Sequence, residues 1–147
     1  MVDPQRARHL LALYRRYRRY LDDLAARSDA QLRSDFAVMG GVRHYLLLAI
    51  ETLLDLGSHV ISSEGYEPPK NYADVFRVLR DEGVISPAQA DPLMAMARFR
   101  NVLVHLYAEV DEERVLRILR GSLGDLDEFV DTVRRRFAEE LDTDGSA

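Results

Sequence analysis

Residues 45–56 read YLLLAIETLLDL and are apolar on almost every side if they form a helix. Such a helix is stable in water only when other elements cover it, so the segment predicts the buried centre of a bundle. No useful length of the chain alternates with a period of two, and no Asn-Gly or Asp-Gly pair joins two apolar runs. The sequence therefore predicts an all-α fold.

The central helix should be long. Ser28 and Gln31 have the spacing of a capping box, which predicts a helix that begins there and reaches about Ser62. Gly40 and Gly41 each lower helix propensity by about 1 kcal/mol relative to alanine, so we expect a kink or a close helix crossing there.

N-cap candidates at Asp3, Asn71 and Asp111, together with prolines at helix starts, predict the other helices, for a single bundle of about five in all. We expect helices over residues 4–27, 72–82, 92–107 and 111–141, the last of them bent near Gly121 and Gly124. Ser86-Pro87 and Asp91-Pro92 are two successive helix starts, so a brief turn of helix should precede the helix at 92.

Length and composition limit the classes of function. The 147 residues, 47% of them apolar, suffice for one domain, which we place at 1–141 with a frayed tail at 142–147. The absence of cysteine excludes a disulfide framework, a thiolate metal site and a cysteine nucleophile. We find no run of about 18 to 20 apolar residues and no signal-peptide pattern, so we expect a cytoplasmic protein without membrane contact.

The formal net charge of −5 argues against broad nucleic-acid binding, because neutralising phosphates requires a basic surface. Any contact with nucleic acid must then be local. Arg15, Arg16, Arg18 and Arg19 on the first helix are candidates for such a contact, and a solvated helix face is the alternative.

Residues 98–107, RFRNVLVHLY, gather a guanidinium, an amide, an imidazole and a phenol at the end of an apolar helix. These groups suit RNA cleavage without a metal, in which the RNA's own 2′-hydroxyl is the nucleophile. The His105 imidazole would move protons at neutral pH, and the Arg100 guanidinium would hold the charge of the pentavalent phosphorane. In a chain this rich in arginine, chance alone gives about half a match to an arginine and a histidine at this spacing. The spacing by itself is therefore weak evidence for a catalytic pair, and the surrounding sequence must support the assignment.

The helical spacing raises a geometric question about this pair. Asn101 and His105 share a face, whereas Arg100 lies about 140° around the helix from His105. Either the helix loosens near His105, or the long arginine reaches round, or the same segment of a second chain completes the site. The third arrangement would make a homodimer part of the mechanism.

A polar stripe crosses the central helix at His44, Glu51, Asp55 and His59. One interpretation places it in a cleft against the motif, with Asp55 or Glu51 orienting His105 or pairing with Arg100. Another makes it the exposed face of the helix. A metal site is a further interpretation, although two histidines fifteen residues apart are not a typical ligand pair.

The motif and its flanks resemble the HepT-like members of the HEPN superfamily. The resemblance rests on RNVLVHLY at 100–107 and on DLGSHVI at 55–61, PP at 68–69, YADVF at 72–76 and GVI at 83–85, and it spans about residues 45–119. It implies a dimeric helical bundle, with endoribonuclease activity in active members. The motif shows no departure from the family pattern.

The resemblance also implies roles for individual residues. Arg100 and His105 would be the catalytic pair, supported by Asn101, and Tyr107 matches the tyrosine that a minimal nucleotidyltransferase antitoxin of the MntA kind adenylylates in similar toxins. RNA would be the substrate, and no cofactor or metal is expected. The alternative is a catalytically silent helical adaptor or a nucleotide-binding subunit of a nucleotidyltransferase complex, which the net negative charge favours.

Overall fold

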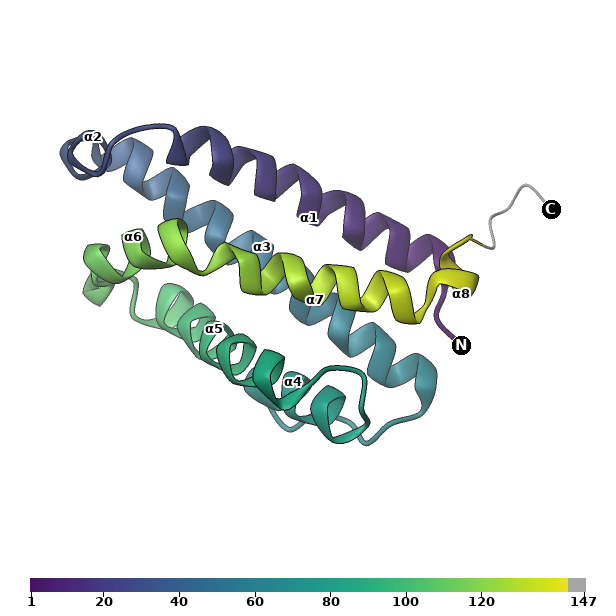
Figure 1. Ribbon diagram of the computed structural model, residues 1–147. Helices are drawn as coiled ribbons and strands as arrows, with labels where there is room; N and C mark the ends of the chain where they lie inside the picture. The colour runs from purple at the N-terminus through teal and green to yellow at the C-terminus, as the bar shows by residue number, and fades with distance from the viewer. Residues whose placement is uncertain (143–147) are drawn as a thin grey trace.

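The apolar segment at 45–56 lies in the middle of α3 (Phe36–Glu64), which runs through the centre of the bundle (Figure 1). The structure is a computed structural model that describes residues 1–142, and the predicted tail lies outside them except for Asp142. α1 (Pro4–Ala25) packs along α3, and α4 (Tyr72–Asp81) and α5 (Pro87–His105) pack against each other and α3.

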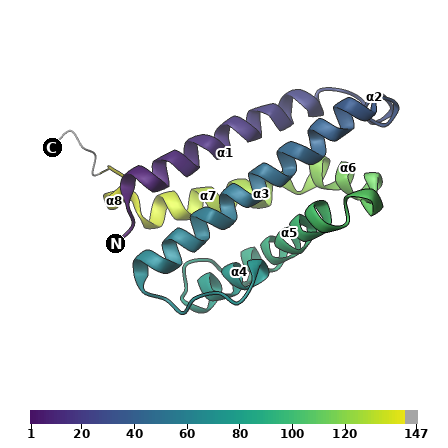
Figure 2. The ribbon, with the colours of Figure 1, turned by 180° about the vertical axis from the view of Figure 1, so that it is seen from behind.

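The remaining elements are also helical, and residues 1–142 contain no β-strand. They are α2 (Asp29–Ser34), the 3-10 turn η1 (Tyr107–Glu109), α6 (Glu112–Gly121), α7 (Leu123–Arg136) and α8 (Ala138–Asp142). α7 passes in front of α3 in Figure 1 and behind it in Figure 2, so it covers one side of the central helix. The predicted all-α fold is confirmed.

Burial explains the composition of α3. Of the helices in residues 1–142, α3 alone is long and apolar enough to cross a membrane by these two criteria. Its side chains form much of the core, which also contains the fully buried rings of Phe76, Phe99 and Phe129. Phe76 and Phe129 meet edge to face with their centroids 5.3 Å apart. The apolar character of α3 therefore follows from its central position in the bundle.

The prediction of one helix over 28–62 is wrong. The Ser28–Gln31 capping box is present, but it opens only the short α2, and the backbone becomes extended at Asp35. The Asp35 carboxylate then accepts hydrogen bonds from the backbone N–H groups of Ala37 and Val38 and starts α3. The helix continues through Gly40 and Gly41, and a Cβ atom at Gly41 would lie 3.8 Å from the Leu24 side chain of α1, which is ordinary van der Waals contact between the two helices.

The separate turn of helix before Pro92 is a second correction. Ser86 and Gln89 form a capping box, Pro87 occupies the first helical position, and α5 continues from there through Pro92 to His105. Pro92 removes a single backbone donor near the start of the helix, which the capping box and the burial of Leu93 and Met96 outweigh.

The helix predicted over 111–141 begins at its Asp111 cap but forms three pieces. It ends first at Gly121 and again before Phe137, whose buried ring lies between α7 and α8 in the sequence. Near Gly121 and Gly124, where a bend was expected, the helix is interrupted at the single residue Ser122. In total the structure has more helices than the five predicted, because long predicted helices are interrupted.

A charged network fixes the N-terminus of α4. Asn71 caps the helix as predicted, and the Asp74 carboxylate accepts hydrogen bonds from the Lys70 backbone N–H and from the Arg77 guanidinium. The bond from Arg77, followed by that from Lys70, lowers the pKa of Asp74 to about 2. Because its pKa is depressed in the folded state, Asp74 stabilises the fold above its unfolded pKa and loses this effect as the pH falls toward 2.

Asp74→Asn should therefore lower the free energy of unfolding by about 1 kcal/mol at neutral pH, and the difference from the unsubstituted protein should shrink between about pH 5 and pH 2. Urea unfolding of both proteins across this range measures it. The control is Asp81→Asn, which removes the more exposed partner of Arg77 and should cost at most about 0.5 kcal/mol. A difference for Asp74→Asn that did not change with pH would contradict the assignment.

Candidate functional site

Arg100 projects from α5 toward α3, where Glu51 holds it. Its Nε and Nη2 atoms donate to the same carboxylate oxygen of Glu51 at 3.1 and 2.9 Å, and Nη1 donates to Oδ1 of Asn101 at 3.2 Å. The Arg100 side chain is only 12% exposed, compared with 35% for Glu51. Of the two carboxylates that the sequence offered as partners for Arg100, the structure pairs it with Glu51.

Tyr72, the first residue of α4, covers the Arg100 guanidinium from another side. The Arg100 guanidinium carbon lies 4.2 Å from the centroid of the Tyr72 ring, in cation–π geometry. A pocket of about 130 Å³ opens here, lined by Glu51, Leu54, Asp55, Tyr72 and Arg100. Three helices thus fix the orientation of one arginine at the wall of a small cavity.

Arg100 keeps donors available within this arrangement. A guanidinium carries five N–H donors, and the bonds to Glu51 and Asn101 use three of them. The remaining two belong to Nη1 and Nη2. Within residues 1–142 the structure gives them no acceptor, so the guanidinium can bind an anion while Glu51 holds it.

Asp55 lines the same pocket one helical turn beyond Glu51. Desolvation raises the pKa of its carboxyl group, and the neighbouring Glu51 carboxylate adds to this effect, while Arg6 and Arg100 oppose it. Asp55 makes no hydrogen bond or ion pair to another described side chain. It therefore shapes the charge of the pocket without fixing Arg100 directly.

His105 is exposed to solvent, in contrast to the mostly buried Arg100. It is the last residue of α5, and its side chain is exposed, while Leu106 ends the helix. The Arg100 guanidinium bonds to Glu51 and Asn101, and no bond joins it to His105 in residues 1–142. α5 does not loosen before His105, and Arg100 does not reach round to it. These observations support neither of the two single-chain arrangements considered from the sequence.

Tyr107, the first residue of the η1 turn, borders a second pocket of about 110 Å³. Tyr107 is 56% exposed, and the guanidinium carbon of Arg43 lies 5.2 Å from the centroid of its ring. Arg43 is mostly buried, and its Nε atom has no hydrogen-bond partner, while Nη2 reaches Glu112 at 3.3 Å. His44 and Leu47 of α3 also line this pocket. The phenol of Tyr107 thus meets solvent beside a cation.

The polar stripe of α3 does not act as one unit. Glu51 and Asp55 face Arg100, and His44 lies near Tyr107, but Nε2 of His59 accepts the backbone N–H of Asp3 at 3.0 Å. His59 therefore secures the N-terminal segment instead of contacting the motif. No three His, Cys, Asp or Glu side chains in residues 1–142 lie close enough together to hold a metal ion.

Sequence reasoning assigned no role to Tyr72 or Arg43. Tyr72 lies inside a segment that supported the family resemblance, but nothing local indicates that α4 would place its ring on Arg100. Arg43 interrupts an apolar stretch of α3, which is a usable signal, since a mostly buried cation needs a partner.

The fold and the sequence define the class of this protein. Its fold matches the tri-AMPylated HEPN toxin of Shewanella oneidensis, solved in complex with MNT antitoxin, with a TM-score of 0.83, 23% identity, and coverage of 92% of this chain and 99% of that one. Bacillus subtilis YutE, described as a cytosolic protein of unknown function, also gives a TM-score of 0.83 at 23% identity, covering 99% and 98%.

Residues 11–133 match the family described as ribonuclease HepT-like, so the chain belongs to the HepT-like family. It is 26% identical over 105 residues to the mRNA nuclease HepT of Shewanella oneidensis, covering 71% of this chain and 79% of that protein. It is 29% identical over 94 residues to the putative RNase YutE of Bacillus subtilis, covering 64% and 65%.

Proposed function

We propose that this protein is the toxin of a bacterial toxin–antitoxin pair, a cytoplasmic, metal-independent endoribonuclease that acts as a homodimer. The observation that carries the proposal is the environment of the Arg100 guanidinium. Glu51, Asn101 and Tyr72 hold the guanidinium at a pocket wall, and two of its donors remain available. Membership of a family described as ribonucleases supports the same conclusion.

In the proposed reaction the 2′-hydroxyl of the RNA attacks the adjacent phosphorus atom. His105 accepts the hydroxyl proton, and the two available donors of Arg100 stabilise the charge on the non-bridging oxygens. The bond to the 5′-oxygen breaks and that oxygen takes up a proton, which leaves a 2′,3′-cyclic phosphate and a 5′-hydroxyl end. Because His105 and Arg100 of one chain do not converge, we place the reaction between two copies of the α5 end.

Cleavage of RNA by the purified protein should persist in EDTA and leave 2′,3′-cyclic phosphate ends, since no step of this reaction uses a metal ion. Incubation of labelled RNA with and without EDTA, followed by end-group analysis, measures both properties. The protein under assay should sediment as a homodimer. Loss of all cleavage in EDTA, with recovery on adding a divalent metal, would overturn the metal-independent mechanism.

We also propose that a nucleotidyltransferase antitoxin of the MntA kind controls the protein by adenylylating Tyr107. The phenol is exposed, so an enzyme can reach it. Adenylate at this position would place a phosphate and a bulky base beside Arg43, where it would obstruct RNA. The related Shewanella oneidensis toxin is described as tri-AMPylated.

Tyr107→Phe should retain most of the nuclease activity and lose modification by the antitoxin, because only the acceptor hydroxyl is removed. Mass spectrometry of the protein co-expressed with its antitoxin measures the adenylate. Tyr20→Phe is the matched control, since Tyr20 is also exposed but lies on α1 and should leave modification unchanged. Adenylate found on another residue of the Tyr107→Phe protein would contradict the assignment.

The alternative function is a catalytically silent adaptor or a nucleotide-binding subunit of a nucleotidyltransferase complex. The Glu51–Arg100 ion pair favours it, because a carboxylate that neutralises an arginine also occurs at purely structural sites. The two functions differ in one measurable property. The adaptor would bind its partner without cleaving RNA at any concentration.

A further inference from the structure

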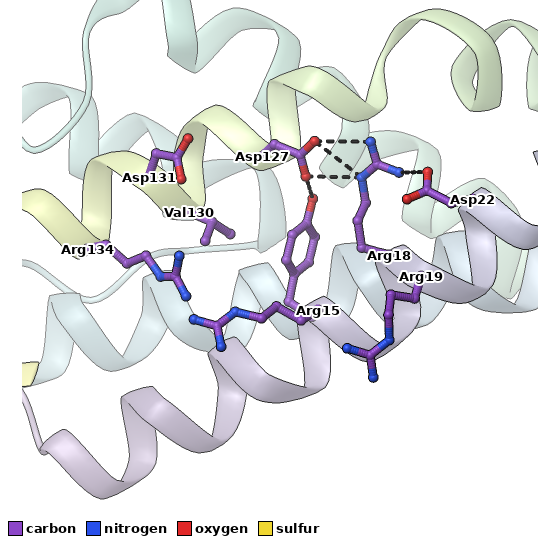
Figure 3. Close-up of a pocket in the computed structure, with 9 residues that line it drawn as sticks. Arg15, Arg18, Arg19, Asp22, Asp127, Val130, Asp131 and Arg134 are labelled. Carbon is purple, nitrogen blue, oxygen red and sulfur yellow. Dashed lines mark hydrogen bonds and ion pairs between the residues drawn. The ribbon is translucent and has the colours of Figure 1, made fainter.

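A groove of about 330 Å³ between α1 and α7 concentrates arginine side chains (Figure 3). Its charged lining comprises Arg15, Arg18, Arg19 and Asp22 from α1 and Asp127, Asp131 and Arg134 from α7. It shares no lining residue with the pocket at Arg100 or with the pocket at Tyr107. The groove is therefore separate from the proposed catalytic site.

A hydrogen-bonded network forms one wall of this groove. The Tyr14 hydroxyl donates to Oδ1 of Asp127 at 2.6 Å, and Nε and Nη2 of Arg18 both reach the same carboxylate at 3.0 Å. Arg18 also pairs with Asp22. Burial, reinforced by Asp127, raises the pKa of Tyr14, so its hydroxyl keeps its proton and remains a donor. The network neutralises Arg18 and fixes α1 against α7.

Three arginines remain in the groove after this network is complete. Arg15, Arg19 and Arg134 make no hydrogen bond or ion pair within residues 1–142. Arg15 and Arg134 extend toward each other from the two helices in Figure 3. Arg15 and Arg19 are four residues apart, so they lie on the same face of α1. Asp131 is the one carboxylate left to offset them, and it forms no ion pair with any of the three.

Arg15, Arg19 and Arg134 add three positive charges to a groove in which only Asp131 is left to offset them, so the local charge favours binding of an anion. The guanidinium fork matches the oxygens of a phosphate. The chain as a whole carries a net charge of −5, so its binding to RNA requires a local basic surface of this kind. We propose that the α1–α7 groove binds backbone phosphates of the RNA substrate, away from the bond that is cleaved. This inference rests on the proposed ribonuclease function.

The test measures RNA affinity in the cleavage-deficient His105→Ala protein, so that the RNA stays intact. Arg15→Gln/Arg134→Gln should weaken binding of a labelled single-stranded RNA by about tenfold or more at moderate salt. The slope of log affinity against log salt concentration should become shallower by about 1.4, which corresponds to two lost phosphate contacts on a single strand. Fluorescence anisotropy at several salt concentrations gives both values.

The matched control is Arg117→Gln/Arg136→Gln, which removes the same charge from two exposed arginines outside the groove. It should change affinity by less than about twofold, because long-range screening by salt reduces the effect of distant charges. Equal affinity and equal salt slopes for the groove variant and this control would overturn the proposal. Unchanged RNA affinity with weaker binding to the antitoxin would also overturn it and assign the groove to a protein partner.

The same measurements separate this inference from the proposed function. If the unsubstituted protein cleaves RNA and the groove variant binds RNA as tightly as the control, only the groove assignment fails. If the unsubstituted protein neither binds nor cleaves RNA, the proposed ribonuclease function fails, and the groove assignment fails with it.

Discussion

His105→Ala should reduce RNA cleavage by about 10²- to 10⁴-fold and relieve the growth arrest that we expect when the protein is expressed without a partner. The reason is that the substitution removes the imidazole proposed to accept the 2′-hydroxyl proton. His105 is exposed at the end of α5, so the variant should fold normally. Initial cleavage rates on a defined RNA, with circular dichroism as a check on folding, measure the effect.

His9→Ala is the control for this prediction, because His9 is also an exposed histidine but lies on α1 without a proposed role. Arg100→Lys should also strongly reduce RNA cleavage. An ammonium group cannot reproduce the three directed bonds to Glu51 and Asn101 and still offer a planar pair of donors to phosphate. Arg98→Lys, an exposed neighbour on α5, is its control. Normal cleavage by folded His105→Ala protein would refute the catalytic assignment.

Mixing two inactive variants distinguishes a composite site from one built within a single chain. If Arg100 of one chain works with His105 of the other, a heterodimer of Arg100→Ala and His105→Ala contains one intact site. With equal mixing and free exchange, about a quarter of the original activity should return. No recovery, under conditions where native mass spectrometry shows that the heterodimer has formed, would rule out the composite site.

The second large effect concerns stability. Gly57→Val should lower the free energy of unfolding by about 3 kcal/mol, because a Cβ atom at Gly57 would lie 2.7 Å from Cγ1 of Val75 and 3.3 Å from Cδ1 of Leu79. Val75 is β-branched and cannot rotate away freely. The substitution must therefore push α4 away from α3, and with it the Tyr72 ring that covers Arg100. Urea unfolding measures the loss.

Gly40→Val is the matched control on the same helix. Apart from its chain neighbours and the nearby backbone of α3 itself, no atom lies within 4 Å of a Cβ atom built at Gly40, so valine should change stability by no more than about 0.5 kcal/mol in either direction. Equal effects of the two substitutions would show that the close approach of α3 and α4 at Gly57 does not limit stability.

The sequence by itself determined the features that depend on neighbours along the chain. The continuous apolar surface of 45–56 identified the central helix, and the caps at Asp3, Asn71 and Asp111 located three helix starts. Local signals failed where two of them competed. Ser28 and Asp35 both cap helices, and only the packed structure shows that α2 ends between them. Pro92 marks a start in the sequence, but the capping box at Ser86 and burial keep it inside α5.

The sequence predicted which types of residue form the candidate site, but it did not predict how these residues are arranged in space. Glu51 and Arg100 are 49 positions apart, and periodicity within each helix could not choose between Glu51 and Asp55 as the partner. The Tyr72 ring over Arg100, Arg43 over Tyr107 and the α1–α7 groove all join separate helices. Such contacts depend on how the helices pack around α3, because burial of apolar surface sets their mutual positions, and only the tertiary structure contains that information.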